Sequence, residues 1–209
     1  MLIDVKQTLT TTYNITEQQI HLLEEYVKLL LTWQEHTNLI GKNTVDNLWE
    51  RHILDSVQLL PYIQHQGVNI ADVGTGAGLP GLVLSICNPE NTYFLIEATS
   101  KKTNFLSEVK QQLKLLNVEV INKRLEDITD IPSIDVLMSR AVTSLASLML
   151  ISKNLLNKNT KCLFLKGRSY QFEINEFMSN PRNKKKYNLV TYQSVTSSES
   201  MILEINRNN

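Results

Sequence analysis

Hydrophobic residues recur at helical spacing through the first third of the chain. A capping-box pattern over residues 16–19 precedes one such repeat and predicts a helix of about 16 to 18 residues that begins near Glu17. A second helix is expected over residues 44–60 and ends before Pro61. The apolar residues that repeat at helical spacing in the first helix are Ile20, Leu23, Val27, Leu30 and Leu31. Residues 1–65 are therefore expected to form a helical extension packed on the rest of the chain.

From Ile70 onwards, short apolar runs alternate with helical patterns. Strands are expected over residues 70–73, 92–97, 118–122, 135–139 and 161–166, and helices over residues 79–87, 101–116, 144–156 and 170–178. The helix over 101–116 should turn Phe105, Val109, Leu113 and Leu116 inward. Two last runs, 188–195 and 201–205, are close enough for an antiparallel hairpin. Such repeats predict an α/β domain over residues 66–209 with a parallel sheet between helices.

Composition narrows the class of protein. The 209 residues are 42% hydrophobic and 20% charged, which is typical of a soluble globular protein. No apolar run reaches the ~18 residues of a membrane span, and the N-terminus lacks a signal-peptide pattern, so we expect a cytoplasmic protein without membrane contact. Cys87 and Cys162 form no Cys/His cluster and are interpreted as core thiols, so no metal site is expected.

The net charge of zero conceals an asymmetry. Residues 1–150 hold 11 Lys/Arg and 17 Asp/Glu, whereas residues 151–209 hold 10 Lys/Arg and 4 Asp/Glu, so the balances are −6 and +6. Charge separated in this way favours one face that meets an anion. For the run Lys184–Lys186 alone, a solvated surface explains the pattern equally well.

The stretch from Ile70 to Gly81 carries the strongest functional signal. A predicted strand turns through Gly74, Gly76 and Gly78 into a predicted helix. Glycines let the backbone approach a ligand closely, and a helix N-terminus offers unpaired N–H groups. Because ligands of parallel sheets lie beyond the carboxyl ends of the strands, this turn predicts a site for a nucleotide-like ligand.

The glycine spacing distinguishes between two such ligands. Counted from Gly74, the dinucleotide fingerprint fails at Leu79; counted from Gly76 it fits, but the strand would then have to continue through Gly74. The pattern suits S-adenosylmethionine better. Glu97, at the end of the second strand, can accept hydrogen bonds from ribose hydroxyls, which both ligands carry. The final hairpin favours a methyltransferase, because five parallel strands and a hairpin make the seven-stranded methyltransferase sheet.

Several segments together resemble one family closely, the ribosomal RNA small subunit methyltransferase G family, also called glucose-inhibited division protein B. The specific stretches are Arg-His-Ile-Leu-Asp-Ser at residues 51–56 and Ser-Arg-Ala at residues 139–141. The other matching stretches are residues 38–39, 49–50, 72–82, 101–102, 105–106, 124–126 and 165–167.

The resemblance implies a Rossmann-like, seven-stranded S-adenosylmethionine-dependent methyltransferase fold with an N-terminal helical extension. It implies methylation of N7 of one guanine of 16S rRNA, near the decoding centre of the 30S subunit. It also implies cofactor contacts at Gly74, Leu79, Leu125, Glu126 and Arg140, although the family usually has a smaller residue at position 125. We expect a monomer.

Arg140 follows the fourth predicted strand and is the proposed catalytic residue. Guanine N7 carries a lone pair and no proton, so its methylation needs orientation and desolvation rather than a base. An arginine here has three candidate targets: the cofactor carboxylate, guanine O6 or a phosphate. A structural salt bridge is the alternative.

Six further residues are candidate RNA contacts, and solvated or structural roles are the alternative for each. Four of them follow predicted strands near the cofactor rim, and two lie on the second predicted helix, where Arg51 can also pair with Asp55. The six are Arg51, His52, Lys101, Lys102, Lys166 and Arg168.

Overall fold

In the computed structural model, which describes residues 4–63, 65–140 and 142–208, seven strands form one sheet in the order β3-β2-β1-β4-β5-β7-β6. Strands β1 to β5 run parallel, β7 runs antiparallel to β5, and β6 pairs antiparallel with β7. The predicted sheet and its terminal hairpin are confirmed. The strands are β1 Asn69–Val73, β2 Thr92–Ile96, β3 Val118–Ile121, β4 Val136–Arg140, β5 Lys161–Lys166, β6 Tyr187–Gln193 and β7 Met201–Arg207.

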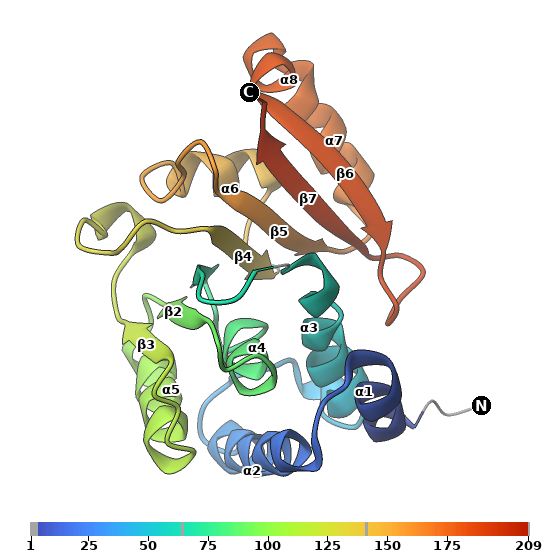
Figure 1. Ribbon diagram of the computed structural model, residues 1–209, viewed down its shortest axis with the longest axis vertical. Coiled ribbons are helices and arrows are strands. Elements are labelled where there is room, and N and C mark those ends of the chain that lie inside the picture. The colour runs from blue at the N-terminus through green and yellow to red at the C-terminus, as the bar shows by residue number, and fades with distance from the viewer. Residues whose placement is uncertain (1–3, 64, 141, 209) are drawn as a thin grey trace.

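Eight α-helices are described around this sheet, and Figure 1 shows α1 to α3 gathered near α4 at one end of the molecule, with α8 beside the hairpin at the other. Sequence reasoning missed the short helices α1 and α8. The helices are α1 Val5–Tyr13, α2 Glu17–Gln34, α3 Asp55–Val57, α4 Gly81–Cys87, α5 Ser100–Gln112, α6 Leu145–Ile151, α7 Tyr170–Ser179 and α8 Pro181–Lys186.

Alternate residues of the central strands face two different cores. In β1, Ile70 belongs to the cluster under the extension, α4 and α5, while Ala71 belongs to the cluster under α6 and α7. In β5, Leu163 belongs to the first cluster and Phe164 to the second. This period of two on a sheet covered on both faces explains why the strands are continuous apolar runs.

The N-terminal extension shares the first of these cores. Leu30 of α2 lies in one buried cluster with Leu82 and Phe105, so packing is continuous across the boundary that we expect near residue 65. The capping box of α2 is present: Gln19 accepts from the backbone N–H of Thr16. The amide nitrogen of Gln19 also donates to the carbonyls of Ile86 and Cys87 at the end of α4. The extension thus caps the helix that follows the glycine turn.

The continuous helix expected over residues 44–60 is wrong. The segment is a 3-10 turn at Lys42–Thr44, a π-helix at Trp49–Leu54, the short α3, and a second 3-10 turn at Leu60–Tyr62. The wide π turn is visible in the hydrogen bond from the N–H of Asp55 to the carbonyl of Glu50. Irregular helical turns of this kind often mark functional sites, and the periodicity of apolar residues does not reveal them.

Two other helices end earlier than expected. After α5, Lys114 adopts a left-handed conformation with φ of 54°, which stops the helix. As a result Leu116 is 96% exposed and Leu115 is buried in its place, so the inward position expected for Leu116 is wrong. The helix expected over 144–156 is α6 alone, followed by turns.

The tight packing at the start of α4 predicts a stability effect. A Cβ on Gly81 would lie 2.5 Å from Leu95 Cδ2 and 2.7 Å from Asp72 Oδ2. Gly81→Ala should therefore lower the free energy of unfolding by about 1–3 kcal/mol, measured by urea denaturation. Gly167→Ala is the matched control, because a Cβ there meets nothing within 4 Å. Equal destabilisation by the two substitutions would contradict this account of the packing.

Candidate functional site

The buried carboxylate of Asp72 fixes the turn after β1 through two hydrogen bonds. Its Oδ2 accepts hydrogen bonds from Thr75 Oγ1 at 2.6 Å and from the N–H of Gly81 at 2.7 Å. Burial raises the pKa of Asp72 to about 6, although both hydrogen bonds act in the opposite direction. One carboxylate thus joins the start of the glycine turn to the start of α4.

Above this carboxylate the backbone follows a path that glycines permit. Gly74, Gly76 and Gly78 have φ angles of 65°, 60° and 89°. At Gly74 a Cβ would also lie 2.5 Å from a methyl carbon of Val142, so this position has neither the conformation nor the space for a side chain. Tyr26 of the extension holds the same turn, because its hydroxyl donates to the carbonyl of Ala77 at 2.8 Å.

Glu97 connects the glycine turn to the start of α5. Its Oε2 accepts from the N–H of Gly76 at 3.1 Å, and its Oε1 accepts from the N–H of Thr99 at 2.9 Å. Lys102 lies 3.9 Å from the same carboxylate. The side chain is buried and fixed in orientation at the carboxyl end of β2, where a ribose contact is expected.

A groove of about 510 Å³ runs along the carboxyl ends of β1, β2 and β4. Of the sequence-predicted cofactor residues, Gly74, Glu97, Leu125, Glu126 and Arg140 line it. Gly76, Gly78 and Leu79 do not; they shape the turn behind it, and Leu79 is buried. Lys102, which the sequence places near the cofactor rim, also lines the groove. Sequence reasoning did not assign the remaining lining residues to the cofactor site: Val73, Ile96, Ala98, Lys123, Arg124, Val142 and Ile151.

Arg140 separates this groove from a second pocket of about 280 Å³, since it lines both. One guanidinium nitrogen donates to Asp55 Oδ2 at 3.2 Å and to the carbonyl of Arg51 at 3.1 Å. The other nitrogen lies 3.1 Å from His52 Nδ1. The pairing of Arg51 with Asp55 that the sequence permits is not found, because Asp55 pairs with Arg140 instead. The second pocket is lined by Arg51, His52, Asp55, Arg140, Leu165, Lys166, Gly167, Thr196, Ser197 and Ser200.

His52 is neutral in this setting. Burial, and then the neighbouring charges of Arg140 and Arg51, lower its pKa to about 4. Its Nε2 lies 2.8 Å from Thr44 Oγ1, whose hydroxyl in turn donates to the carbonyl of Gly41. A proton on Nε2 and a free lone pair on Nδ1 satisfy both contacts, so His52 accepts from Arg140.

The six candidate RNA contacts fall into different settings. Arg51 and His52 line the second pocket, and Lys101 and Lys102 lie in the first turn of α5. Lys166 is buried, with its ammonium 2.8 Å from Glu173 and 2.6 Å from the carbonyl of Thr143, so a phosphate contact there would require breaking this ion pair. Arg168 is exposed and pairs with Glu199 at 2.7 Å.

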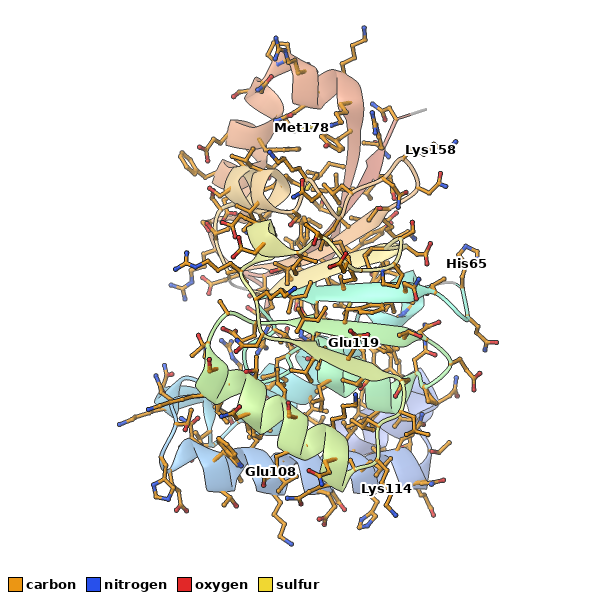
Figure 2. All side chains as sticks on the ribbon, turned by 90° about the vertical axis from the view of Figure 1, so that its left-hand side faces the viewer. His65, Glu108, Lys114, Glu119, Lys158 and Met178 are labelled. Atoms are coloured by element: carbon orange, nitrogen blue, oxygen red, sulfur yellow. The ribbon has the colours of Figure 1, made fainter. Side chains whose placement is uncertain are left out.

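The charge asymmetry of the sequence has a partial structural explanation. Among the acids of residues 151–209, Glu173, Glu199 and Glu204 pair with Lys166, Arg168 and Lys161. Other cations of this segment, Lys153, Lys186 and Arg207, line a small cleft at the amino end of β5. Figure 2 shows Lys158, which precedes β5, on the same side of the molecule as His65, which precedes β1. The excess positive charge thus lies largely away from the glycine turn.

None of the described helices is both long and apolar enough to cross a membrane. Within residues 4–63, 65–140 and 142–208, no three His, Cys, Asp or Glu side chains gather as metal ligands. Cys87 and Cys162 are buried free thiols, as the sequence predicts.

Solved structures of other proteins share the fold of this chain. The chain superposes on the ribosomal protein L11 methylase of Lactobacillus delbrueckii subsp. bulgaricus with a TM-score of 0.58 at 13% identity, over 74% of this chain and 77% of that one. It superposes on TYW2 of M. jannaschii, solved in complex with AdoMet, with a TM-score of 0.57 at 13% identity, over 81% and 78% of the two chains. At these identities the likeness concerns the fold, and it confirms the predicted Rossmann-like methyltransferase architecture.

Sequence comparison reaches further. A family model described as rRNA small subunit methyltransferase G matches residues 19–202. A protein of that name from Orientia tsutsugamushi (strain Boryong) is 38% identical over 205 residues, 98% of this chain and 99% of its own. Another from Rickettsia bellii (strain OSU 85-389) is 39% identical over 192 residues, 92% and 95% of the two chains. The resemblance that the motifs indicate is therefore confirmed, and the chain belongs to the ribosomal RNA small subunit methyltransferase G family.

Proposed function

We propose that this protein transfers a methyl group from S-adenosylmethionine to N7 of one guanine in the 16S rRNA of the small ribosomal subunit. The observation that carries the proposal is the position of Arg140 between two pockets in a chain of this family: Gly74 of the glycine turn lines one pocket, and Arg51 and His52 line the other. We further infer that the enzyme acts as a monomer in the cytoplasm.

The groove fits S-adenosylmethionine in size and chemistry. Its volume is in the range of small-molecule sites. Gly74 provides a surface without a side chain, and Glu97 offers a fixed carboxylate for the ribose hydroxyls. Ile96, Leu125 and Ile151 provide an apolar lining for the adenine ring. Leu125 is the bulkier residue that departs from the family pattern, and it belongs to this lining.

When bound, S-adenosylmethionine supplies a methyl group on a cationic sulfur, which guanine N7 can accept with its lone pair and without loss of a proton. The protein therefore has no proton to remove; it orients the two reactants and excludes water. The neutral His52 is consistent with a reaction that needs no base, because its Nδ1 lone pair accepts from Arg140. Ser139, whose hydroxyl donates to the carbonyl of Val73, is buried and also stands outside the chemistry.

Arg140 is proposed to bind an anion or acceptor at the boundary of the two pockets: guanine O6, the cofactor carboxylate or a phosphate. Arg51 and His52 would contact the RNA within the second pocket, and Lys101, Lys102 and Arg168 would contact phosphates near the cofactor groove, which Lys102 lines. To Lys166 we assign a bracing role, since it ties the segment after β4 to α7 through Glu173.

The direct test is methyl transfer. With tritiated S-adenosylmethionine and 30S particles that lack N7 methylation, the protein should add one methyl group per particle, and mapping of the labelled nucleotide should place it on guanine N7. Naked 16S rRNA assayed in parallel identifies the substrate form. Label on another base, or no label on either substrate, would refute the proposal.

Arg140→Ala should abolish methylation, because the variant loses the only guanidinium that lines both pockets in the described part of the chain. Arg140→Lys should lower the rate of methylation about 100-fold, because lysine keeps the positive charge but lacks the planar pair of guanidinium donors. Rates are measured by tritium incorporation with saturating substrate. Near-normal turnover in either variant would remove Arg140 from the site.

The lowered pKa of His52 predicts a pH-dependent stability. The unfolded chain binds a proton at His52 below its ordinary pKa of 6.5, whereas the folded chain does so only near pH 4. Stability from neutral His52 is thus fully present above pH 6.5 and is lost as the pH falls towards 4. Asp72 acts oppositely, because its raised pKa costs stability as the pH rises from 3.8 to 6.

Comparison with His52→Gln isolates the histidine, since Asp72 contributes equally to both proteins. Urea denaturation at several pH values should show the wild type losing stability relative to this variant between pH 6.5 and 4. Parallel stability curves would show that His52 titrates normally.

A further inference from the structure

The turn between β6 and β7, residues 194–200, reaches Arg140 through Asp55. One oxygen of the Asp55 carboxylate, Oδ2, contacts the guanidinium. The other, Oδ1, accepts from Thr196 Oγ1 at 2.6 Å and from Gln58 Nε2 at 2.8 Å. Because two donors hold one oxygen, the carboxylate is fixed in rotation and directs its second oxygen at Arg140.

The side-chain amide of Gln58 is itself fixed by hydrogen bonds at both its oxygen and its nitrogen. Gln58 is 2% exposed, its Oε1 accepts from the N–H of Val195 at 2.9 Å, and its Nε2 also donates to Ser194 Oγ at 3.2 Å. This pattern of one accepted and several donated bonds fixes the orientation of the amide. Gln58 thus joins the extension to the β6–β7 turn beside Asp55.

The turn has its own internal bonds. Ser194 Oγ lies 3.0 Å from Thr196 Oγ1 and accepts from the N–H of Thr196 at 3.3 Å. The N–H of Ser194 donates to the carbonyl of Ser200 at 3.1 Å, which closes the turn. Thr196, Ser197 and Ser200 face the second pocket. The turn therefore forms a wall of this pocket and also holds the carboxylate that orients Arg140.

Resting on the function proposed above, we infer that Asp55 is the positioning residue for Arg140. Thr196, in the β6–β7 turn, sets the orientation of the Asp55 carboxylate. The guanidinium of Arg140 is held at both of its terminal nitrogens. The Asp55 carboxylate accepts from one nitrogen, and His52 accepts from the other. This arrangement leaves the guanidinium plane with one orientation between the two pockets. Misplacement of a binding group by about 1 Å costs on the order of 100-fold in rate.

The alternative is that these bonds only fasten the extension to the sheet. In that case, loss of these hydrogen bonds would lower stability and cofactor affinity together. Turnover would then fall only as a result of those two losses. The two accounts differ in which measured quantity changes, so a substitution that removes one hydroxyl can distinguish them.

The test is Thr196→Val, which removes the hydroxyl and keeps a branched side chain. We expect kcat for methylation of 30S particles to fall about 10- to 100-fold. The Kd for S-adenosylmethionine by calorimetry should stay within about twofold, and Tm within about 3 °C. Thr196→Ser should restore kcat, because serine returns the hydroxyl. Thr191→Val, at an exposed position of β6, is the matched control and should match the wild type throughout.

Asp55→Asn gives a second measurement. It should lower kcat at least as far as Thr196→Val, and in this background Thr196→Val should cost nothing more, because both act on the same guanidinium. Wild-type kcat in Thr196→Val, additive losses in the double variant, or parallel loss of Tm and cofactor affinity without rescue by serine would overturn the inference. Failure of the wild type to methylate the subunit would instead overturn the proposed function, so the two failures are distinguishable.

Discussion

The site depends on the buried carboxylate of Asp72. It lies where β1 ends, and its Oδ2 holds Thr75 and the first N–H of α4 at once, so the chain between them has to turn tightly enough to require glycines. Burial favours the neutral form of this carboxyl, and the two hydrogen bonds favour the ionised form. Gly76 then meets Glu97, and Glu97 meets the start of α5. These successive contacts shape the groove that we propose for the cofactor.

The N-terminal extension is part of the site and not an appendage. Tyr26 holds the glycine turn from the outside, Gln19 caps α4, and the carbonyl of Arg51 together with His52 and Asp55 receives Arg140. Regular helix would have used the carbonyl of Arg51 in its own ladder. The π-helical turn at Trp49–Leu54 accompanies the exposure of these groups to Arg140. The irregular backbone and the proposed chemistry therefore share the same residues.

Patterns of local origin were predictable from the sequence. The strands and the hairpin follow from periodicity, and the capping box follows from the pairing of Thr16 with Gln19 three residues later. The glycine turn with Glu97 follows from spacing along neighbouring strands. The π-helical turn was not predictable, because its apolar positions are also compatible with an α-helix. The pairing of Asp55 with Arg140 was hidden because Arg51, four residues away, offers a simpler partner. Burial of Lys166 and the role of Thr196 depend on contacts between distant segments, which no local pattern encodes.

The two halves of the site differ in how far apart their parts lie along the chain. On the glycine side, Asp72 and Gly81 are 9 residues apart, and Gly76 and Glu97 are 21 apart. On the arginine side, Asp55 is 85 residues from Arg140 and 141 from Thr196. Contacts over short loops form at a lower entropic cost than contacts over long ones. The arginine side therefore costs more chain entropy to assemble than the glycine side, and it is complete only when the terminal hairpin is docked on Asp55.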